Sequence, residues 1–175
     1  MKNLLLIAII VLGFSGAAFA QPSVGVTATA TSSATIITPI AIAKSTAGDM
    51  NFGNVAVSGT GGTVILSPTN ARSFTGGVAL PTILGTVASA SFDVTGLGGS
   101  VYSITIPTTS ISAISGASPA MSVGTWTSFP TVATGGILDG SGKQTVKVGA
   151  TLTVAALQPA GTYITPAFSV TVNYN

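Results

Sequence analysis

Hydrophobic residues recur at every second position along much of this chain, and no stretch shows the period of about 3.6 residues that marks an amphipathic helix. In residues 90–95, for example, Ala90, Phe92 and Val94 alternate with three polar residues. Such alternation is typical of strands that bury one face and expose the other, as in antiparallel sheets. Thr, Val, Ile and Gly are also abundant, which favours strands and turns. The pattern therefore predicts an all-β fold.

Segments rich in Gly or Pro separate these alternating rows and predict turns between strands. They are residues 59–62, 76–77, 96–99, 139–140 and 158–161. One strand and one turn in about ten residues is the spacing of a β-sandwich. Residues 110–136 are the least periodic part of the chain, so we expect a long loop there. Residues 36–175 are expected to form one domain.

The N-terminus has the features of a secretory signal peptide. Lys2 supplies a positive charge, residues 4–12 form an apolar run, and Ala18 and Ala20 fit the A-x-A cleavage pattern. The run is too short to span a hydrocarbon core of about 30 Å as a helix. We therefore expect residues 1–20 to direct export and to be removed, which leaves no membrane span in the mature chain.

The composition argues against most kinds of chemistry. Charged residues make up 5% of the chain, His and Cys are absent, and all three acidic residues are Asp. This inventory offers no imidazole base, no thiolate nucleophile and no soft-metal site. A formal charge of +2 is too small for a nucleic-acid footprint. We therefore expect no enzyme, no cofactor, no metal and no nucleic-acid partner.

Three local motifs allow a chemical interpretation beside a structural one. Residues 139–144 resemble a phosphate-binding P-loop, but Ile137 replaces its first Gly and Gln144 replaces its Ser or Thr, so they predict a hairpin turn. Lys147 lies near hydroxyl groups, as a Ser–Lys nucleophile pair would require. It falls on the polar face of its predicted strand, however, where a lysine is ordinarily solvated. Trp126 and Phe129 are a candidate platform for stacking a sugar, with packing in the core or a loop as the alternative.

The two ends of the expected mature chain carry the most distinctive pattern. The N-terminal arm, residues 21–35, leads into the sandwich and carries a row of small apolar side chains on one parity. This candidate donor row is Val24, Val26, Ala28, Ala30, Ala34 and Ile36. The C-terminal row is Ile164, Phe168, Val170, Val172 and Tyr174.

Because the sequence stops just after the C-terminal row, we expect the sheet to lack the next strand and to leave a groove beside that row. An arm from another copy could fill the groove by β-strand addition. Alternatively, the arm could close its own sandwich as an ordinary first strand. A surface with few charges suits a protein that packs against copies of itself.

Several of these residues resemble known pilin signatures. Tyr174 in the penultimate position, the strand that ends there and Gly161 upstream resemble the C-terminal signature of chaperone–usher pilins. Residues 49–55 resemble the strand start of secreted pilins of the spore coat protein U type, and residues 148–154 with 158–163 resemble their end region. The mature chain as a whole is similar to a family of short secreted bacterial β-proteins. Unlike many such pilins, it has no cysteine and hence no disulfide.

The resemblance implies an immunoglobulin-like, pilin-like Greek-key β-sandwich that lacks one strand and is completed by donor-strand exchange. It implies a periplasmic chaperone that fills the groove first and an outer-membrane usher that exchanges it for the next subunit's arm. The expected function is thus that of a structural subunit of a surface fimbria or pilus, exported through the periplasm. The alternative is a self-contained secreted or surface binding module, such as a carbohydrate adhesin that uses Trp126.

Overall fold

The computed structural model describes residues 25–113 and 119–175. The predicted signal peptide, residues 1–20, and Val24 of the candidate donor row lie outside the described residues. The chain divides into two units, one that ends at Thr35 and one that spans Ile36–Asn175, which we call the body. In the first unit, residues 25–35 contain no strand or helix, and their side chains are exposed.

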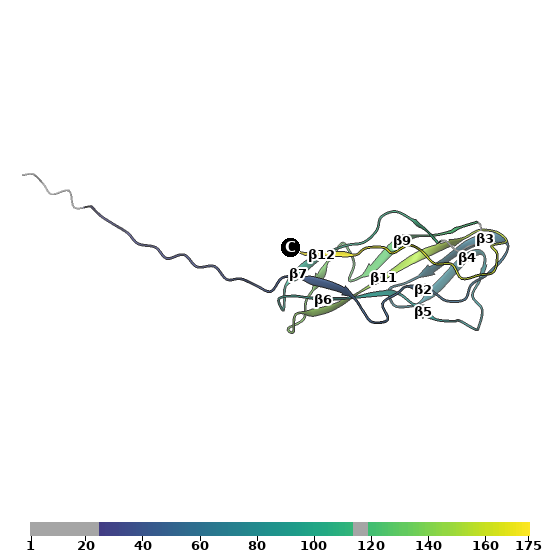
Figure 1. Cartoon of the computed structure of the whole chain (residues 1–175), viewed down its shortest axis with the longest axis horizontal. Helices are drawn as coiled ribbons and strands as arrows, with labels where there is room; N and C mark the ends of the chain where they lie inside the picture. Colours follow the sequence, from purple (N-terminus) through teal and green to yellow (C-terminus); the bar gives the residue numbers. More distant parts are fainter. Residues whose placement is uncertain (1–24, 114–118) are drawn as a thin grey trace, which may run out of the picture. The chain divides into compact units, whose positions relative to one another are not determined.

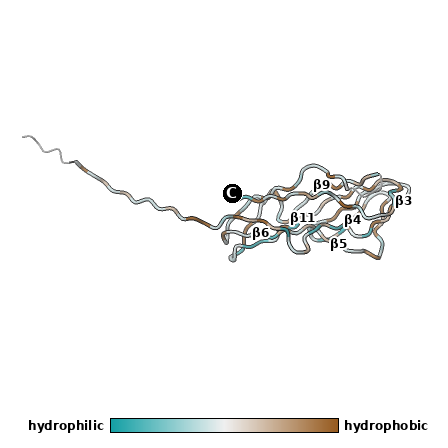
Figure 2. The backbone as a smooth tube through the Cα atoms, in the orientation of Figure 1, coloured by the Kyte–Doolittle hydropathy of each residue, from teal (hydrophilic) through white to brown (hydrophobic). Residues whose placement is uncertain are grey.

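The body consists of antiparallel β-strands, which confirms the all-β prediction (Figure 1). Its strands are β1 (Ala41–Lys44), β2 (Asn51–Phe52), β3 (Ala56–Leu66), β4 (Arg72–Ala79), β5 (Val87–Ala88), β6 (Ala90–Thr95), β7 (Val101–Thr105), β8 (Ile111–Ala113), β9 (Met121–Phe129), β10 (Gly136–Ile137), β11 (Lys143–Val154) and β12 (Thr171–Tyr174). Across 25–113 and 119–175 there is no helix that could span a membrane. Strongly hydrophilic residues are sparse along the body (Figure 2).

The long strand β11 organises the larger, seven-stranded sheet, which curls into a half-barrel. Its first half pairs with β6 and its second half with β3, while β9 pairs along its opposite edge. The change of partner falls near Gly149, where an added Cβ would lie 2.2 Å from the carbonyl oxygen of Leu66. A glycine is therefore needed at the point where β3 takes over from β6.

A three-stranded sheet of β10, β7 and β12 covers only one part of this large sheet. There, Tyr102, Ile104 and Val172 pack in one core cluster with residues of β6 and β11, and the Tyr102 hydroxyl donates a 2.6 Å hydrogen bond to Oε1 of Gln144. A second core cluster contains buried residues of β3, β4, β9 and β11 only. Over this second cluster lies no strand of the small sheet but the segment around β2, with Met50 and Phe52 packed against it.

The expectation of a long loop over residues 110–136 is wrong. The nine-residue strand β9 lies in this region, preceded by β8. The alternation of apolar and polar residues is interrupted within β9, so the sequence pattern does not reveal this strand. Thr125 has a φ of 48°, and the register against β11 shifts between Gly149 and Thr151. A left-handed residue inside a strand changes which face the following side chains occupy.

Two of the predicted turns, at residues 59–62 and 76–77, are also wrong. Both segments lie inside the paired strands β3 and β4, and Gly62 is the cross-strand partner of Gly76. These glycines permit close approach of two backbones, because an added Cβ at Gly62 would lie 2.1 Å from the Thr75 carbonyl oxygen. Glycines that are required for the close packing of two strands thus look like a turn signal in the sequence.

The other three turn predictions, at residues 96–99, 139–140 and 158–161, fall in turns or bends as expected. Asp139 stabilises its turn, because its carboxylate accepts the backbone N–H groups of Ser141 and Lys143 at 2.8 and 2.9 Å. The turn does not close a hairpin, however, because β10 pairs with β7. It carries the chain from the small sheet to β11 of the large sheet.

The predicted C-terminal strand is shorter than expected. Strand order begins only at Thr171, and Ile164 forms a single bridge within otherwise irregular chain. From Phe168 to Tyr174 the expected alternation holds, with the apolar row buried or half-buried. Ile164 departs from it and is 69% exposed. Pro166 accounts for the break, because a proline has no N–H to donate to a ladder.

Replacing Gly77 with Ala should destabilise the body. The added Cβ would lie 2.0 Å from the Thr60 carbonyl oxygen, and backbone atoms must move to admit it. We expect the free energy of unfolding to fall by about 1–3 kcal/mol in urea titrations. Gly59→Ala is the matched control. Gly59 lies in β3, the partner of the strand that contains Gly77, and a Cβ added at Gly59 would meet nothing within 4 Å. Equal effects of the two substitutions would contradict the close-approach interpretation.

Stability should also depend on pH through Tyr102, because burial raises the pKa of its phenol above 10.0. Above about pH 10 the unfolded chain loses this proton while the folded chain keeps it, so the free energy of unfolding falls as the pH rises. Tyr102→Phe should remove this part of the fall, at a cost of about 1 kcal/mol at neutral pH for the lost hydrogen bond. Urea titrations from about pH 8 to 11 measure both effects, and an unchanged slope in the variant would refute the assignment.

Candidate functional site

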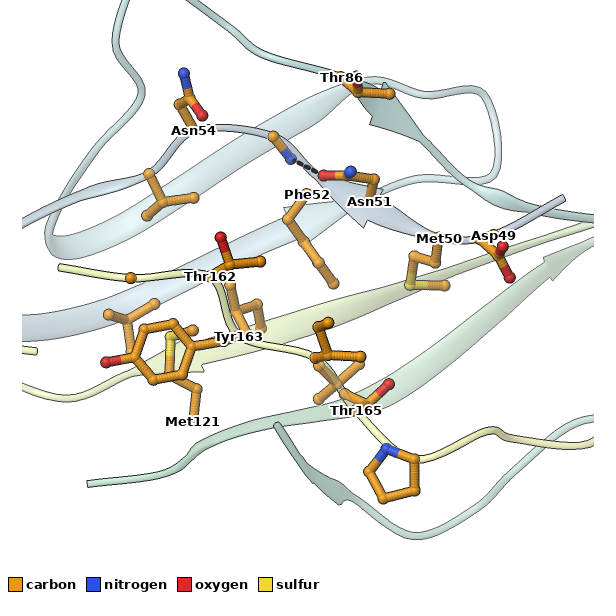
Figure 3. A pocket seen from close by; sticks show the side chains of 18 of the residues that line it. Asp49, Met50, Asn51, Phe52, Asn54, Thr86, Met121, Thr162, Tyr163 and Thr165 are labelled. Carbon is orange, nitrogen blue, oxygen red and sulfur yellow. Dashed lines mark hydrogen bonds between the residues drawn. The ribbon is translucent and has the colours of Figure 1, made fainter. Parts of the chain in front are cut away.

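A cleft of about 1150 Å³ opens over the second core cluster, where the small sheet is missing. Two segments border it, residues 49–57 around β2 and residues 158–168, which we call the N-terminal rim and the C-terminal rim. Figure 3 shows Met50 and Phe52 directed into the cleft from the N-terminal rim, with Thr162, Tyr163 and Thr165 on the facing segment. The cleft is thus elongated along two extended stretches of backbone.

The floor of the cleft is apolar. Val123 of β9 and Leu152 and Val154 of β11 are 4%, 6% and 4% exposed, and Met121 beside them is half-buried. The charged lining residues are Lys44 and Asp49, which form an exposed 2.8 Å ion pair at one end. Such an exposed pair contributes little to stability. Among the described residues no group of His, Cys, Asp and Glu could hold a metal ion. The floor of the cleft is therefore suited to apolar side chains.

The N-terminal rim is held firmly along one edge. Strand β2 pairs with β5, and the N–H of Asn54 donates a 2.7 Å hydrogen bond to the carbonyl of Leu84. Arg72 of β4 adds two bonds from Nη1, to the carbonyl of Phe52 at 2.6 Å and to that of Asn54 at 3.1 Å. Its Nη2 is buried without a partner among the described residues. A guanidinium that binds the carbonyls on both sides of Gly53 fixes the orientation of that segment.

Gly53 gives this rim its shape. Its φ is 69°, and an added Cβ would lie 2.4 Å from the Leu84 carbonyl oxygen, so only glycine fits. The side-chain oxygen of Asn51 accepts the Gly53 N–H at 2.8 Å, as the dashed line in Figure 3 shows. Phe52 and Gly53, within the segment 49–55 that resembles a pilin strand start, therefore mark the bend at the cleft's edge.

The C-terminal rim is attached mainly at its two ends. Near one end the N–H of Leu157 bonds to the Ser58 carbonyl at 3.1 Å, and the side-chain amide of Gln158 donates to the carbonyl of Pro119. Within the rim, the Tyr163 hydroxyl bonds back to the carbonyl of Pro159 at 2.8 Å. Residues 158–168 include a single bridge residue and no strand. Most of this backbone therefore has no ladder partner in the described structure.

Three aromatic rings line the cleft at the end where Lys44 of β1 pairs with Phe92 of β6. Phe168 lies 4.7 Å from Trp126 and 6.3 Å from Phe92 between ring centroids. Trp126 is fixed by a 2.9 Å hydrogen bond from Nε1 to the Thr109 carbonyl. We call Phe92, Trp126 and Phe168 the aromatic stop, because these three rings line the cleft and also pack against the first core cluster.

The predicted groove-lining row is split by the structure. Ile164 and Phe168 line the cleft, while Val170, Val172 and Tyr174 pack in or against the first core cluster. The Tyr174 hydroxyl accepts the Leu97 N–H at 2.7 Å and donates to the Thr38 carbonyl at 2.9 Å. The open space therefore lies beside residues 158–168 and not beside the strand that bears Tyr174.

The described residues of the candidate donor row are exposed and form no strand. Val26 and Ile36 are 93% and 94% exposed, and Ala28, Ala30 and Ala34 are exposed too. None of these residues belongs to a strand of the described structure.

The proposed sugar platform of Trp126 and Phe129 is not formed. Trp126 is half-buried against both core clusters, whereas Phe129, three positions along β9, is 64% exposed. An odd separation on a strand directs two side chains to opposite faces. The two rings therefore cannot stack on one ligand.

Sequence reasoning missed the floor of the cleft and the residue that orients its rim. Met121 and Val123 fall in the segment expected to be a loop, and Leu152 and Val154 fall in residues 148–154, which only the resemblance to secreted pilins distinguishes. The signal for Arg72 was present, because it is one of only five basic residues in the chain. Because basic residues are rare in this chain, one that lies between a strand end and a glycine-rich segment indicates a specific polar partner for its side chain.

Replacing Arg72 with Met should loosen the N-terminal rim. The substitution keeps much of the side-chain length but removes two charge-assisted hydrogen bonds to backbone carbonyls. We expect the free energy of unfolding to fall by about 2–3 kcal/mol, and hydrogen exchange at the Asn54 amide to accelerate. Lys143→Met removes an exposed charge and should change stability by less than about 0.5 kcal/mol. An unchanged exchange rate at Asn54 in Arg72→Met would argue against this role.

Comparison with known proteins gives one result. No curated protein and no solved structure matches the chain. A family described as a domain of unknown function, DUF4402, matches residues 40–174, which include both rims and the floor of the cleft. Because the match covers more than three quarters of the sequence, the chain belongs to the DUF4402 family.

Proposed function

We propose that this protein is the structural subunit of a filament in which the arm of one copy fills the cleft of the next. The observation that carries the proposal is the cleft itself, which has an apolar floor and is bordered by two lengths of backbone. Backbone edges of this kind are templates for an added strand, which pairs through its own N–H and C=O groups. Alternate side chains of that strand then enter the floor.

The arm has the properties that such a strand requires. Its described residues are exposed and unpaired in any strand, and its apolar side chains fall on one parity. About ten backbone hydrogen bonds would each contribute roughly 0.5–1.5 kcal/mol, against roughly 1–2 kcal/mol per residue for ordering the backbone. Burial of Val and Ala adds to the favourable side. Because these terms are close, side-chain fit decides whether the strand binds.

The same proposal extends to the fold and to the route of assembly. Two antiparallel sheets packed face to face, with one stretch of the smaller layer missing, agree with an incomplete immunoglobulin-like sandwich. An exported subunit with an open apolar cleft needs a cover before assembly, because exposed edges aggregate. A periplasmic chaperone and an outer-membrane usher are the partners we propose for this step, and the cell surface is the proposed destination. The half-buried Trp126 gives no support to the alternative of a sugar-binding module.

Replacing Ala28 with Asp should abolish assembly. A carboxylate on the apolar parity would have to enter the floor of the cleft without a partner, which is costly. Thr29→Asp, on the opposite parity, keeps its charge in solvent and should assemble like the unaltered chain. Light scattering after size-exclusion chromatography and electron microscopy of the exported protein measure the result.

The comparison of these neighbouring substitutions separates strand insertion from a general effect of charge. If both variants polymerise as the unaltered chain does, or if removal of residues 21–35 leaves polymerisation intact, the arm is not the connecting strand. If the unaltered chain stays monomeric under every condition that preserves its fold, the filament proposal fails.

A further inference from the structure

Both methionines of the described residues line the cleft. The sequence contains three methionines, of which Met1 lies outside the described residues. Met50 precedes β2 in the N-terminal rim, and Met121 is the first residue of β9. Figure 3 shows both side chains among the residues that line the cleft. Two segments far apart in the sequence therefore bring their methionines to one cavity.

Neither methionine is sealed inside the body. Both are half-buried, and they pack at the edge of the core, Met121 against the second cluster and Met50 against both clusters. The buried members of the second cluster are Val, Leu and Ala residues. Because both methionines line a cleft of about 1150 Å³, a small molecule that enters it reaches the two side chains.

The thioether groups of these residues can react with a peroxide by oxygen transfer. Cysteine and methionine are the residues that such oxidants convert in this way, and the chain has no cysteine to compete for the oxidant. In the reaction the O–O bond of hydrogen peroxide breaks and one oxygen atom bonds to the methionine sulfur. The sulfur loses two electrons, the peroxide gains them, and the products are methionine sulfoxide and water.

This reaction would change the surface of the cleft. A sulfoxide is polar, whereas the floor beside Met121 consists of Val123, Leu152 and Val154. An apolar side chain that enters the oxidised cleft has to cover a polar S=O group, which is unfavourable where no donor binds it. Oxidation should therefore weaken occupation of the cleft and leave the buried residues of both core clusters in place.

We propose that Met50 and Met121 form a site of reversible oxidation, where hydrogen peroxide makes the cleft unsuitable for apolar occupants. Methionine sulfoxide reductases, supplied with electrons by a dithiol, restore the thioethers and with them the apolar surface. An occupant of the cleft shields both side chains from the oxidant. Where that occupant is the arm of a second copy, the inference rests on the proposed function, and oxidation then stops the growth of the filament.

Peptide mass spectrometry of the folded protein in hydrogen peroxide tests whether the site is accessible. Met50 and Met121 should each gain the mass of one oxygen atom, at a rate within about tenfold of that in unfolded peptides of the same sequence. In polymerised protein the rate should be at least about tenfold lower, because the cleft is filled. If both residues stay unoxidised in the folded chain while the peptides react completely, the proposed site is overturned.

Dye binding tests the change of surface without requiring polymerisation. The fluorescence of anilinonaphthalene sulfonate, which binds accessible apolar surface, should fall at least about threefold after oxidation. Met50→Leu with Met121→Leu is the matched control, because it conserves apolar volume and cannot form a sulfoxide. Peroxide should leave its fluorescence unchanged, and circular dichroism verifies that each sample is folded. If this variant does not fold, recovery of fluorescence in the unaltered chain after treatment with both classes of sulfoxide reductase and dithiothreitol decides the same point.

The outcomes separate this inference from the proposed function. Peroxide should lower the rate of polymerisation at least about tenfold in the unaltered chain and change it by less than about twofold in the double variant. An equal loss in both assigns the effect to other residues and overturns the inference. Fluorescence that is unchanged although both methionines are oxidised overturns it too. If the unaltered chain never polymerises, the filament proposal fails, whereas the fluorescence still decides whether oxidation alters the cleft.

Discussion

The small sheet covers only part of the large one, and the cleft follows from this mismatch. Strand β11 is long enough to pair with β6 in its first half and β3 in its second. Strands β7 and β12 pack over the first half, where Tyr102 and Val172 complete one core cluster. Over the second half lie the N-terminal and C-terminal rims, which do not pair with each other as strands of a sheet. Backbone groups there remain without ladder partners, which is costly wherever water is excluded.

The large sheet owes its length and curvature to close approaches that only glycine allows. Gly62, Gly76 and Gly77 let β3 and β4 pair through a register shift, and Gly149 admits the Leu66 carbonyl where β11 changes partner. These contacts extend the large sheet beyond the reach of the small one. The position of the cleft therefore depends on backbone packing at glycines that do not themselves line it.

The sequence predicts the class of fold, the main strand faces and the apolar parity of residues 168–174, because burial on one face imposes a period of two. It fails where backbone geometry departs from that period. Thr125, with its positive φ, conceals β9, and Pro166 ends the order of the C-terminal strand. Paired glycines resemble turns in sequence, because the close approach of two strands and a positive φ in a turn both require glycine. The cleft floor could not be recognised, because a buried row beneath a cleft and a buried row beneath a sheet have identical patterns in sequence.

The C-terminal rim is a poor template for unselective pairing, and this explains why side-chain fit has to decide what binds. Pro159 and Pro166 have no N–H to donate, so the stretch between them is the longest that offers an uninterrupted backbone edge. Prolines on exposed edges are one of the means by which β-proteins prevent aggregation. Tyr163 lies within that short stretch and lines the cleft, as does Phe52 of the other rim. A strand added at this edge, as proposed above, would therefore depend on side-chain contacts with these rings as well as on backbone pairing.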